Sequence, residues 1–168
     1  MPTDLKSTLS VKITAAERET SIGVGAASSQ LLHIFGLDSE LANGTASNQA
    51  DVVYSGSVSL SGATTLDLRG SLSSVLTGDS VSFVEIVAVA LRNKETAAGK
   101  YVDVGGGSNP VSSLWIASGD GVRVGPGGIF LLTSPVDGYT TTAGTADILT
   151  LTPASSADVD YIILGRSA

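Results

Sequence analysis

Residues 80–91 have the sequence SVSFVEIVAVAL, and this stretch decides the fold class. Apolar side chains occupy almost every position in both alternating sets, and the stretch is rich in β-branched residues. Turn-forming residues bound it, with Gly78 before it and Asn93 after it. A strand that is apolar on both faces must be covered on both faces. We therefore expect a central strand of the core here, with the rest of the chain built around it.

Short alternating segments flank this stretch on both sides. Before it, residues 57–61 alternate Ser with Val and Leu, and residues 64–69 repeat the alternation after an interruption at Gly62. After it, short apolar segments separated by Gly and Pro occur at residues 101–104, 114–116, 122–124, 129–132, 147–151 and 159–164. Many short strands with frequent turn signals are typical of a β-sandwich or barrel. We predict an all-β fold, an antiparallel β-sandwich of jelly-roll type, with an immunoglobulin-like sandwich as the alternative.

The N-terminal part is harder to assign. Leu9, Val11 and Ile13 alternate with polar residues, which predicts a short strand. We expect an N-terminal arm or extended segment over residues 1–27. An arm that lies on a neighbouring subunit and a loose chain terminus both fit this segment.

Residues 28–41, SSQLLHIFGLDSEL, fit two secondary structures. Ser28 or Ser29 is a suitable cap for a short helix that Gly36 would end, and a strand fits the same letters. We include this segment in a single β-sandwich domain over residues 28–168.

Composition limits the classes of partner. The chain is 42% hydrophobic but only 15% charged, whereas charged residues average about 25% in globular proteins. A weakly charged surface is expected where partners cover part of it, and a monomer with a Ser/Thr-rich surface fits equally well. The net charge of −7 argues against nucleic-acid binding, since a phosphate backbone needs a basic patch.

Two further classes of feature are missing from the sequence. There is no cysteine, which excludes disulfides, thiolate metal sites and a cysteine nucleophile. The N-terminus has no apolar signal-peptide core, and the apolar stretch at residues 81–91 is too short to span a bilayer. We expect synthesis in the cytoplasm and no membrane partner.

No cluster of residues predicts a reaction. The glycine-rich segments 105–107 and 125–128 lack the phosphate-loop pattern and are explained by tight turns. His33 is the only histidine, so no second imidazole completes a metal or catalytic site. Asp158 and Asp160 lie on one face of a predicted strand, where solvated carboxylates explain them. We expect no enzymatic activity, no cofactor and no metal.

Trp115 is the most notable single residue. With Ile116 it lies between two glycine-rich loops, where it fits a sugar-stacking platform or an interface anchor, although ordinary core packing is the simpler explanation. Arg123 fits either a brace for a loop or a partner for a neighbouring acid. We treat Trp115, Ile116 and Arg123 as candidate interface or ligand contacts.

The order of segments in the C-terminal part resembles that of a known group of proteins. The pieces are the apolar strand 81–91, Arg92-Asn93, VDVG at 102–105, the Trp115 segment, VRVGPGGIFLL at 122–132, Gly138-Tyr139, AGTADIL at 143–149 and VDYIILG at 159–165. This order is similar to that of small structural proteins of tailed bacteriophages and prophages. The shared motifs are strand-and-turn patterns rather than catalytic signatures, and residues 1–50 fall outside them.

The resemblance implies a non-enzymatic component of the virion. Small phage proteins of this kind often decorate and cement the capsid as dimers or trimers, and others lie in the tail. The function expected from it is capsid decoration, which stabilises the mature head by bridging subunits of the major capsid protein. The alternative is a tail or tail-tip component that binds a receptor or carbohydrate.

Overall fold

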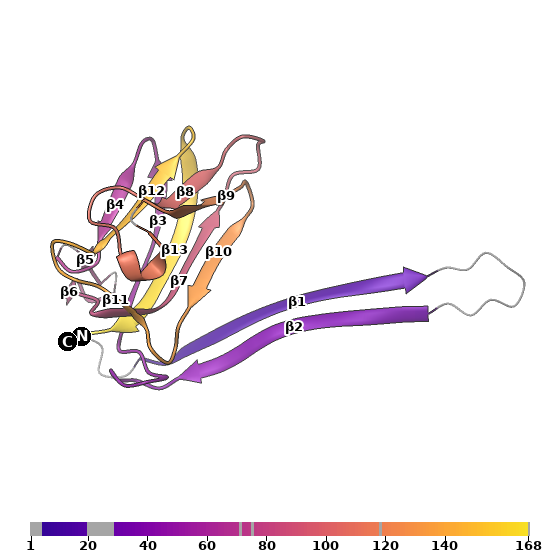
Figure 1. The fold of residues 1–168 in the computed structure, drawn as a ribbon, viewed down its shortest axis with the longest axis horizontal. Helices are drawn as coiled ribbons and strands as arrows, with labels where there is room; N and C mark the ends of the chain where they lie inside the picture. Colours follow the sequence, from indigo (N-terminus) through magenta and orange to yellow (C-terminus); the bar gives the residue numbers. More distant parts are fainter. Residues whose placement is uncertain (1–4, 20–28, 71, 75, 118, 168) are drawn as a thin grey trace, which may run out of the picture.

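A computed structural model describes residues 5–19, 29–70, 72–74, 76–117 and 119–167. It consists of a body made of antiparallel sheets and a long two-stranded arm that projects from the body (Figure 1). Apart from a short 3₁₀ helix, η1 (Ser112–Leu114), the regular elements of the described residues are strands. The prediction of an all-β fold is therefore confirmed. No helix in the described part of the chain has the length and hydropathy needed to cross a membrane.

The body contains two main sheets. The first has the order β10 (Ile129–Thr133), β7 (Glu85–Asn93), β13 (Ala157–Arg166) and β3 (Val52–Leu60), with β11 (Tyr139–Thr140) also paired to β7. The second has the order β4 (Thr64–Asp67), β12 (Ile148–Pro153), β8 (Val102–Gly105) and β9 (Gly121–Val124). A small hairpin joins β5 (Leu72–Ser73) to β6 (Ser80–Val81). All these pairings are antiparallel.

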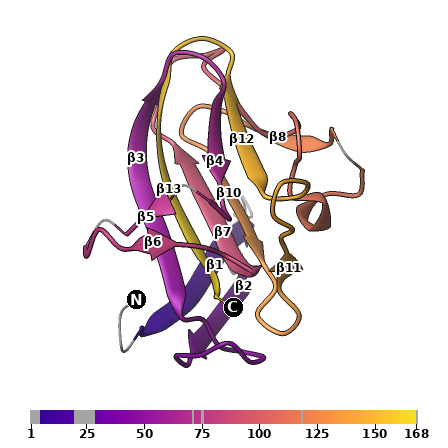
Figure 2. The ribbon, with the colours of Figure 1, turned by 90° about the vertical axis from the view of Figure 1, so that its left-hand side faces the viewer.

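One apolar core lies between the two main sheets, which makes the body sandwich-like (Figure 2). Both sheets contribute fully buried side chains, among them Leu60, Ile86, Leu91, Val102, Val104, Leu149, Leu151 and Ile163. The alternation at residues 57–61 and 64–69 behaves as predicted, because Leu60, Leu66 and Leu68 are all buried. The chain bends at residues 61–62, between β3 and β4.

The expected central strand is present but begins later than predicted. β7 lies inside the first sheet, between β10 and β13. A single strand over residues 80–91 is nevertheless wrong, because β6 ends at Val81 and β7 begins at Glu85. In between, the N–H of Phe83 donates to the carbonyl of Leu68 and the N–H of Val84 donates to the carbonyl of Arg166, each at 2.8 Å. Consecutive backbone N–H groups thus bond to two different segments of the chain, and residues 82–84 separate β6 from β7.

Both faces of β7 are covered, as its sequence requires. Val89 and Leu91 belong to the main core between the sheets. Val87 and Ala88 belong to a second, smaller apolar cluster on the other side, together with Leu9, Leu41, Ala50 and Leu164. Because Leu9 and Leu41 come from the base of the arm, the arm covers part of the sheet that no second sheet covers.

The arm is a β-hairpin of β1 (Ser7–Glu19) and β2 (Ser29–Leu41). The two strands pair antiparallel without interruption from Ser7 opposite Leu41 to Glu19 opposite Ser29. The strand alternative for this segment is thus confirmed, and the helix alternative is wrong. Residues 29–41 lie in the arm, and the boundary expected between residues 27 and 28 lies outside the described residues.

Candidate functional site

The arm extends well beyond the body (Figure 1). Each strand has 13 residues, which at about 3.3 Å per residue corresponds to a length of about 43 Å. It leaves the body beside the exposed side of the first sheet, the side opposite the core. An isolated two-stranded hairpin is only marginally stable in water. The side chains on the two faces of the arm therefore decide what the arm is for.

One face of the arm carries large apolar side chains from its base to its middle. We call it the inner face and define it by Leu9, Val11, Ile13, Phe35 and Leu37. The register places Val11 opposite Leu37 and Ile13 opposite Phe35, so these side chains form cross-strand pairs. Leu9 is buried at the base, but Ile13 and Phe35 are 62% and 68% exposed.

The opposite face, the outer face, changes character along the arm. Near the body it carries polar residues, with Ser10 opposite Asp38 and Lys12 opposite Gly36. Farther out it carries Ile34, which is 62% exposed and lies opposite Thr14. The middle part of the arm, around Ile13 and Ile34, therefore has exposed apolar side chains on both faces, and the sequence of β1 beyond it ends in Glu17, Arg18 and Glu19. Exposed apolar surface costs about 25 cal/mol per Å², so the middle part is stabilised by any surface that covers it.

Apolar contacts fix the base of the arm to the body. Leu9 and Leu41, at the body end of the two strands, are buried in the second cluster against Val87, Ala88 and Leu164. The main-chain N–H of Leu5 also donates to the side-chain oxygen of Asn43 at 3.2 Å. The arm is thus anchored at its base and unsupported beyond it.

A buried arginine holds the loop that follows the arm. The Arg166 side chain is only 4% exposed and lies 2.6 Å from the carboxylate of Glu85. Its guanidinium also donates to the carbonyl of Gln49, in the loop after β2, and to the carbonyls of Pro135 and Val136. One guanidinium therefore joins the end of β13, the start of β7 and two loops. This network sets the position from which the arm leaves the body.

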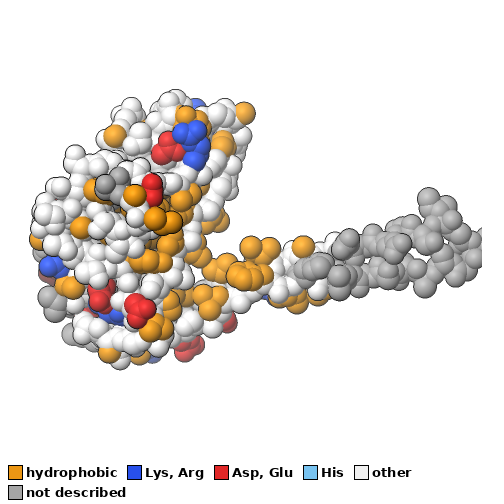
Figure 3. All heavy atoms as spheres, in the orientation of Figure 1, with side chains coloured by type: hydrophobic (Ala, Val, Ile, Leu, Met, Phe, Trp, Pro, Cys, Tyr) orange, Lys and Arg blue, Asp and Glu red, His pale blue; other side chains and the backbone are white. Residues whose placement is uncertain are grey.

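A groove lies where the inner face of the arm meets the exposed side of the first sheet. It has a volume of about 250 Å³. Its lining residues are Thr8, Leu9, Ser10 and Val11 of the arm, and Ala88, Ala90, Leu131, Ile162 and Leu164 of the sheet. None of them is charged. Figure 3 shows hydrophobic side chains gathered in this corner and continuing along the near part of the arm.

The sequence-predicted site residues are not brought together as one site. Trp115 is half-buried and packs against the main core, where its ring stacks on that of Phe130 with the centroids 6.0 Å apart. Its indole nitrogen is buried without a hydrogen-bond partner within the described part of the chain. Ile116, the next residue, is fully exposed. The two neighbours thus point to different environments.

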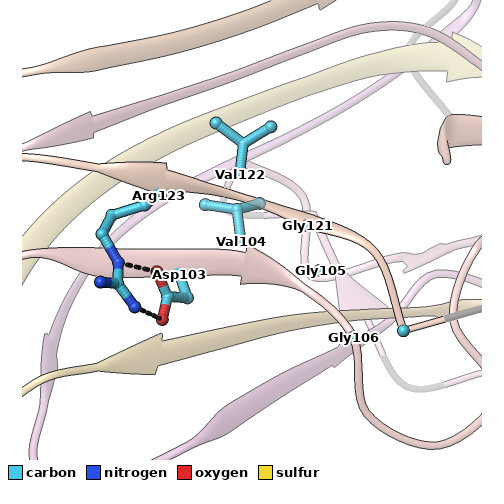
Figure 4. A pocket seen from close by; sticks show the side chains of 8 residues that line it. Asp103, Val104, Gly105, Gly106, Gly121, Val122 and Arg123 are labelled. Carbon is cyan, nitrogen blue, oxygen red and sulfur yellow. Dashed lines mark hydrogen bonds and ion pairs between the residues drawn. The ribbon is translucent and has the colours of Figure 1, made fainter.

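Arg123 lies on β9 and pairs with Asp103 on β8 (Figure 4). Its Nε and Nη2 atoms donate to the two carboxylate oxygens at 2.8 and 3.0 Å. The guanidinium also lies over the Tyr101 ring, 3.7 Å from its centroid. The hydrogen bonds from Arg123 lower the pKa of Asp103, and the same bonds raise the pKa of Arg123. Arg123 therefore pairs with a neighbouring acid, one of the two roles considered for it.

An open cleft of about 450 Å³ lies beside this ion pair. Glycines at the ends of β8 and β9 form much of it, including Gly105, Gly106 and Gly121. Gly105 has a φ of 113°, and a Cβ there would lie 2.9 Å from the Trp115 ring. Trp115 thus supports the floor of the cleft from the core side and does not line the cleft itself.

The other residues considered from the sequence lie apart from each other. His33 lies on β2 opposite Ala15, and its side chain lies outside the described part. Asp160 lies 3.4 Å from Lys94, and a hydrogen bond with Ser57 lowers its pKa. Among the described residues, no group of three or more His, Asp or Glu side chains is placed to hold a metal ion.

Sequence reasoning did not find two parts of the site. The inner face was visible only as an alternation at Leu9, Val11 and Ile13, and its pairing with residues 29–41 was not predicted. The Arg166 network left no local signal, because its partners come from three separate segments of the chain.

Comparison with known proteins provides no relative for this chain. No protein-family model, curated protein or solved structure matches it. The functional interpretation therefore depends on the geometry of the arm and the body, together with the resemblance described above.

Proposed function

We propose that this chain is a non-enzymatic structural protein that joins a larger assembly through its arm. The observation that carries the proposal is the exposed apolar surface on both faces of the arm, with Ile13 and Phe35 on the inner face and Ile34 on the outer face. Monomeric proteins rarely display contiguous apolar surface unless it binds a partner. The arm is also anchored firmly at its base, which fits an element that presents a surface at a distance from the body.

We further propose that the body is a jelly roll. A jelly roll is an antiparallel ribbon of eight strands, folded over and closed into two sheets. In such a ribbon the first strand pairs with the eighth, the second with the seventh, the third with the sixth and the fourth with the fifth. The pairs β3–β13, β4–β12, β7–β10 and β8–β9 follow this pattern, and β13–β7 and β12–β8 are the pairs that close the sheets.

The assembly that we propose is the mature head of a tailed bacteriophage. The resemblance of the C-terminal part supports it, and so does the use of jelly rolls in viral shells, although the latter is an analogy at the level of the fold. The protein would bind the major capsid protein on the assembled shell and stabilise it by binding that state alone. The outer face around Ile34 would provide the contact with the shell.

Co-sedimentation with capsids tests this proposal. Purified protein is mixed with mature capsids that lack it, and the bound amount is measured over a range of concentrations. We expect saturable binding at a fixed copy number, weakened at least ~10-fold by Ile34→Asp, because a charge replaces an apolar side chain that the shell would bury on binding. Leu76→Asp is the matched control, since Leu76 is an exposed apolar residue of the body far from the arm in sequence. Absence of saturable binding by the wild-type protein would overturn the capsid proposal.

The second candidate is a tail component that binds carbohydrate. The observation that favours it is the open cleft with Arg123 and Asp103 at its edge (Figure 4). A planar ion pair of this kind offers hydrogen-bonding groups to sugar hydroxyls. A glycan array provides the test, with Arg123→Gln as the informative variant, since Trp115→Ala would disturb the core. Specific glycan binding that is lost in Arg123→Gln would favour this candidate over decoration.

A further inference from the structure

The first sheet ends in an apolar strand that is paired on one side only. β10 pairs with β7 along one of its edges, and among the described residues no strand pairs with the other edge. We propose that an extended segment of a partner protein pairs with this free edge as a further strand of the sheet, and that the inner face of the arm covers the side chains of the added strand. The inference rests on the proposed role of the arm in assembly, but not on the identity of the larger assembly.

The hydrogen bonds between β10 and β7 show which backbone groups lie on the free edge. Just beyond the two ends of β10, the N–H of Ser134 and the carbonyl of Gly128 bond to β7 at 2.8 and 3.0 Å. In an antiparallel strand, alternate residues bond to the same neighbour, so the even-numbered residues of β10 direct their backbone groups toward β7. The backbone groups on the free edge are therefore those of Ile129, Leu131 and Thr133.

Two of these three residues have no backbone partner in the described part of the chain. The carbonyl of Thr133 accepts a hydrogen bond from the Tyr139 hydroxyl at 3.4 Å. Ile129 and Leu131 each present an N–H and a carbonyl that no described residue bonds. These two sets of groups lie about 6.8 Å apart along the strand. An extended peptide repeats its donors and acceptors at the same spacing, so a peptide strand is the matching ligand.

The sequence of β10 differs from those of the other outer strands of the two main sheets. β9 carries Arg123, β4 carries Asp67, and β3 has serine at every second position over residues 55–59. β10 has the sequence IFLLT, in which no residue is charged, and the Ile129 side chain is 70% exposed. Proteins normally protect an apolar edge strand with charges or a covering element, because such an edge pairs readily with another strand. The sequence of β10 therefore favours an edge that a partner covers.

The arm lies where it can cover the added strand. It leaves the body on the side where β10 forms the margin of the first sheet (Figure 1). Val11 of the inner face and Leu131 of β10 line the same groove. Two residues of a strand span about 6.6 Å, and neighbouring strands of a sheet lie about 4.8 Å apart. Ile13, two residues beyond Val11, and its cross-strand partner Phe35 therefore reach the position of the added strand.

The side chains on the two sides of the added strand determine the chemistry of the partner segment. On the outer side, the segment would meet Leu131 and the inner face of the arm, whose defining residues are all apolar. On the core side, the neighbouring side chains of β10 are Phe130, which belongs to the main core, and Leu132, which packs against it. The matching segment is therefore extended, apolar on both sides and free of proline at the positions that bond to β10.

Selection of binding peptides tests the inference. A displayed library of random ten-residue peptides is enriched on the purified full-length protein. We expect apolar peptides whose affinity is at least ~10-fold lower for Leu131→Pro, because proline removes an N–H from the free edge. The bonds between β10 and β7 do not use this N–H. Leu131→Ala is the matched control, since it shortens the same side chain and keeps the N–H.

Two further variants test the role of the arm. Phe35→Asp should also weaken the binding of the enriched peptides at least ~10-fold, because it places a charge on the face that covers the added strand. Ile34→Asp should leave their binding unchanged, since Ile34 has a similar exposure but lies on the outer face. The same Ile34→Asp variant is expected to weaken capsid binding, so the two proposals respond to different variants.

Amide hydrogen exchange locates the bound peptide. The N–H groups of Ile129 and Leu131 should exchange faster than those of Phe130 and Leu132 in the free protein, and a bound peptide should protect them. Circular dichroism establishes that each variant is folded, and Ile129→Pro with Ile129→Ala replaces the Leu131 pair if Leu131→Pro is not.

Three results would overturn the inference. These are a library from which no peptide is enriched, peptides that bind the proline and alanine variants equally, and a bound peptide that leaves the Leu131 amide unprotected. A protein that binds capsids but enriches no peptide would contradict only this inference. A protein that binds peptides at β10 but no capsids would contradict only the capsid proposal.

Discussion

Gly165 and Arg166, at the end of β13, hold the region from which the arm leaves the body. The pairing of β13 with β7 shifts between Leu164 and Gly165, which marks a β-bulge. Leu164 lies opposite Ala88 and Gly165 opposite Ile86, so the extra residue is Val87 of β7. Arg166 lies opposite Glu85 in the register, and its side chain donates to the Glu85 carboxylate and to loop carbonyls. The direction of the arm thus depends on two residues far from it in sequence.

Gly165→Ala should destabilise the protein by about 2 kcal/mol or more, because overpacking a filled site forces the backbone to shift. An added Cβ would overlap the carbonyl oxygen of Glu85 and lie 2.5 Å from the Phe83 ring. Urea denaturation measures the change. Gly62→Ala is the control, since a Cβ at Gly62 meets no atom within 4 Å. Equal stabilities of the two variants would contradict this account of the bulge.

Arg166→Leu should lower the free energy of unfolding by about 3 kcal/mol, because it leaves Glu85 and three carbonyls without their buried donor. Arg166→Lys should restore little, since an ammonium group cannot reach all these acceptors from one position. The measurement is thermal or urea unfolding. Arg123→Leu, which removes an arginine whose ion pair is exposed, should have a much smaller effect. The account fails if the two leucine variants lose similar stability.

At the scale of residues, the sequence drew attention to unusual residues but did not predict what their side chains contact. Trp115 and Arg123 stood out because one is the single tryptophan and the other lies between glycine-rich turns. In the structure Trp115 is half-buried against the core, and Arg123 belongs to a surface ion pair. Arg166 did not stand out, because its importance comes from burial among carbonyls of segments more than 30 residues away. Sequence patterns carry no signal for such contacts.

At the scale of elements, the pairing of β3 with β13 contains a half-buried tyrosine pair, Tyr54 and Tyr161. The rings of Tyr54 and Tyr161 are 5.7 Å apart, and the Tyr161 hydroxyl donates to that of Tyr54 at 3.4 Å. Gly56, opposite Tyr161 in the register, leaves room for the Tyr161 ring. Burial, and to a lesser extent the bond with Tyr54, raises the pKa of Tyr161.

This shift predicts a loss of stability at high pH. A tyrosine in the unfolded chain ionises near pH 10, whereas Tyr161 in the folded protein keeps its proton to higher pH. Above about pH 10 the unfolded state therefore binds fewer protons than the folded state, and the free energy of unfolding falls as the pH rises. Urea denaturation between pH 8 and pH 11 measures the slope. Tyr161→Phe should flatten it, and an unchanged slope in that variant would contradict the assignment.

Of the two strands of the arm, the sequence predicted one and left the other ambiguous. Leu9, Val11 and Ile13 predicted a strand because polar residues alternate with them. Residues 28–41 remained ambiguous because Leu32 and Ile34 are apolar on the face opposite Phe35 and Leu37. A segment that is apolar on both faces shows no alternation, so periodicity cannot separate strand from helix. Apolar residues on both faces prevented the prediction of this strand, and they also leave apolar surface that a partner can cover.

At the scale of the whole molecule, sequence reasoning reached the all-β class and the sandwich-like body. The alternation of short strands with turns was sufficient for that, since it reflects one covered face per strand. It did not reach the sheet order, because β3 pairs with β13 and β4 with β12 across most of the chain length. The arm surface could not be predicted for the same reason. It exists only where β1 and β2 meet the exposed side of β7, β10 and β13.

Amide hydrogen exchange along β1 and β2 tests the central claim, that the arm is an assembly element covered by a partner. The measurement compares wild-type protein with Ile34→Asp, each free in solution and after mixing with mature capsids. We predict protected arm amides in the capsid-bound wild-type protein, and loss of this protection in the free protein and in the variant, because a lone two-stranded hairpin opens readily. The amides of β7 should stay protected throughout. Arm amides that exchange as freely in the capsid-bound wild-type protein as in the free protein, or that are protected equally in Ile34→Asp, would contradict the account.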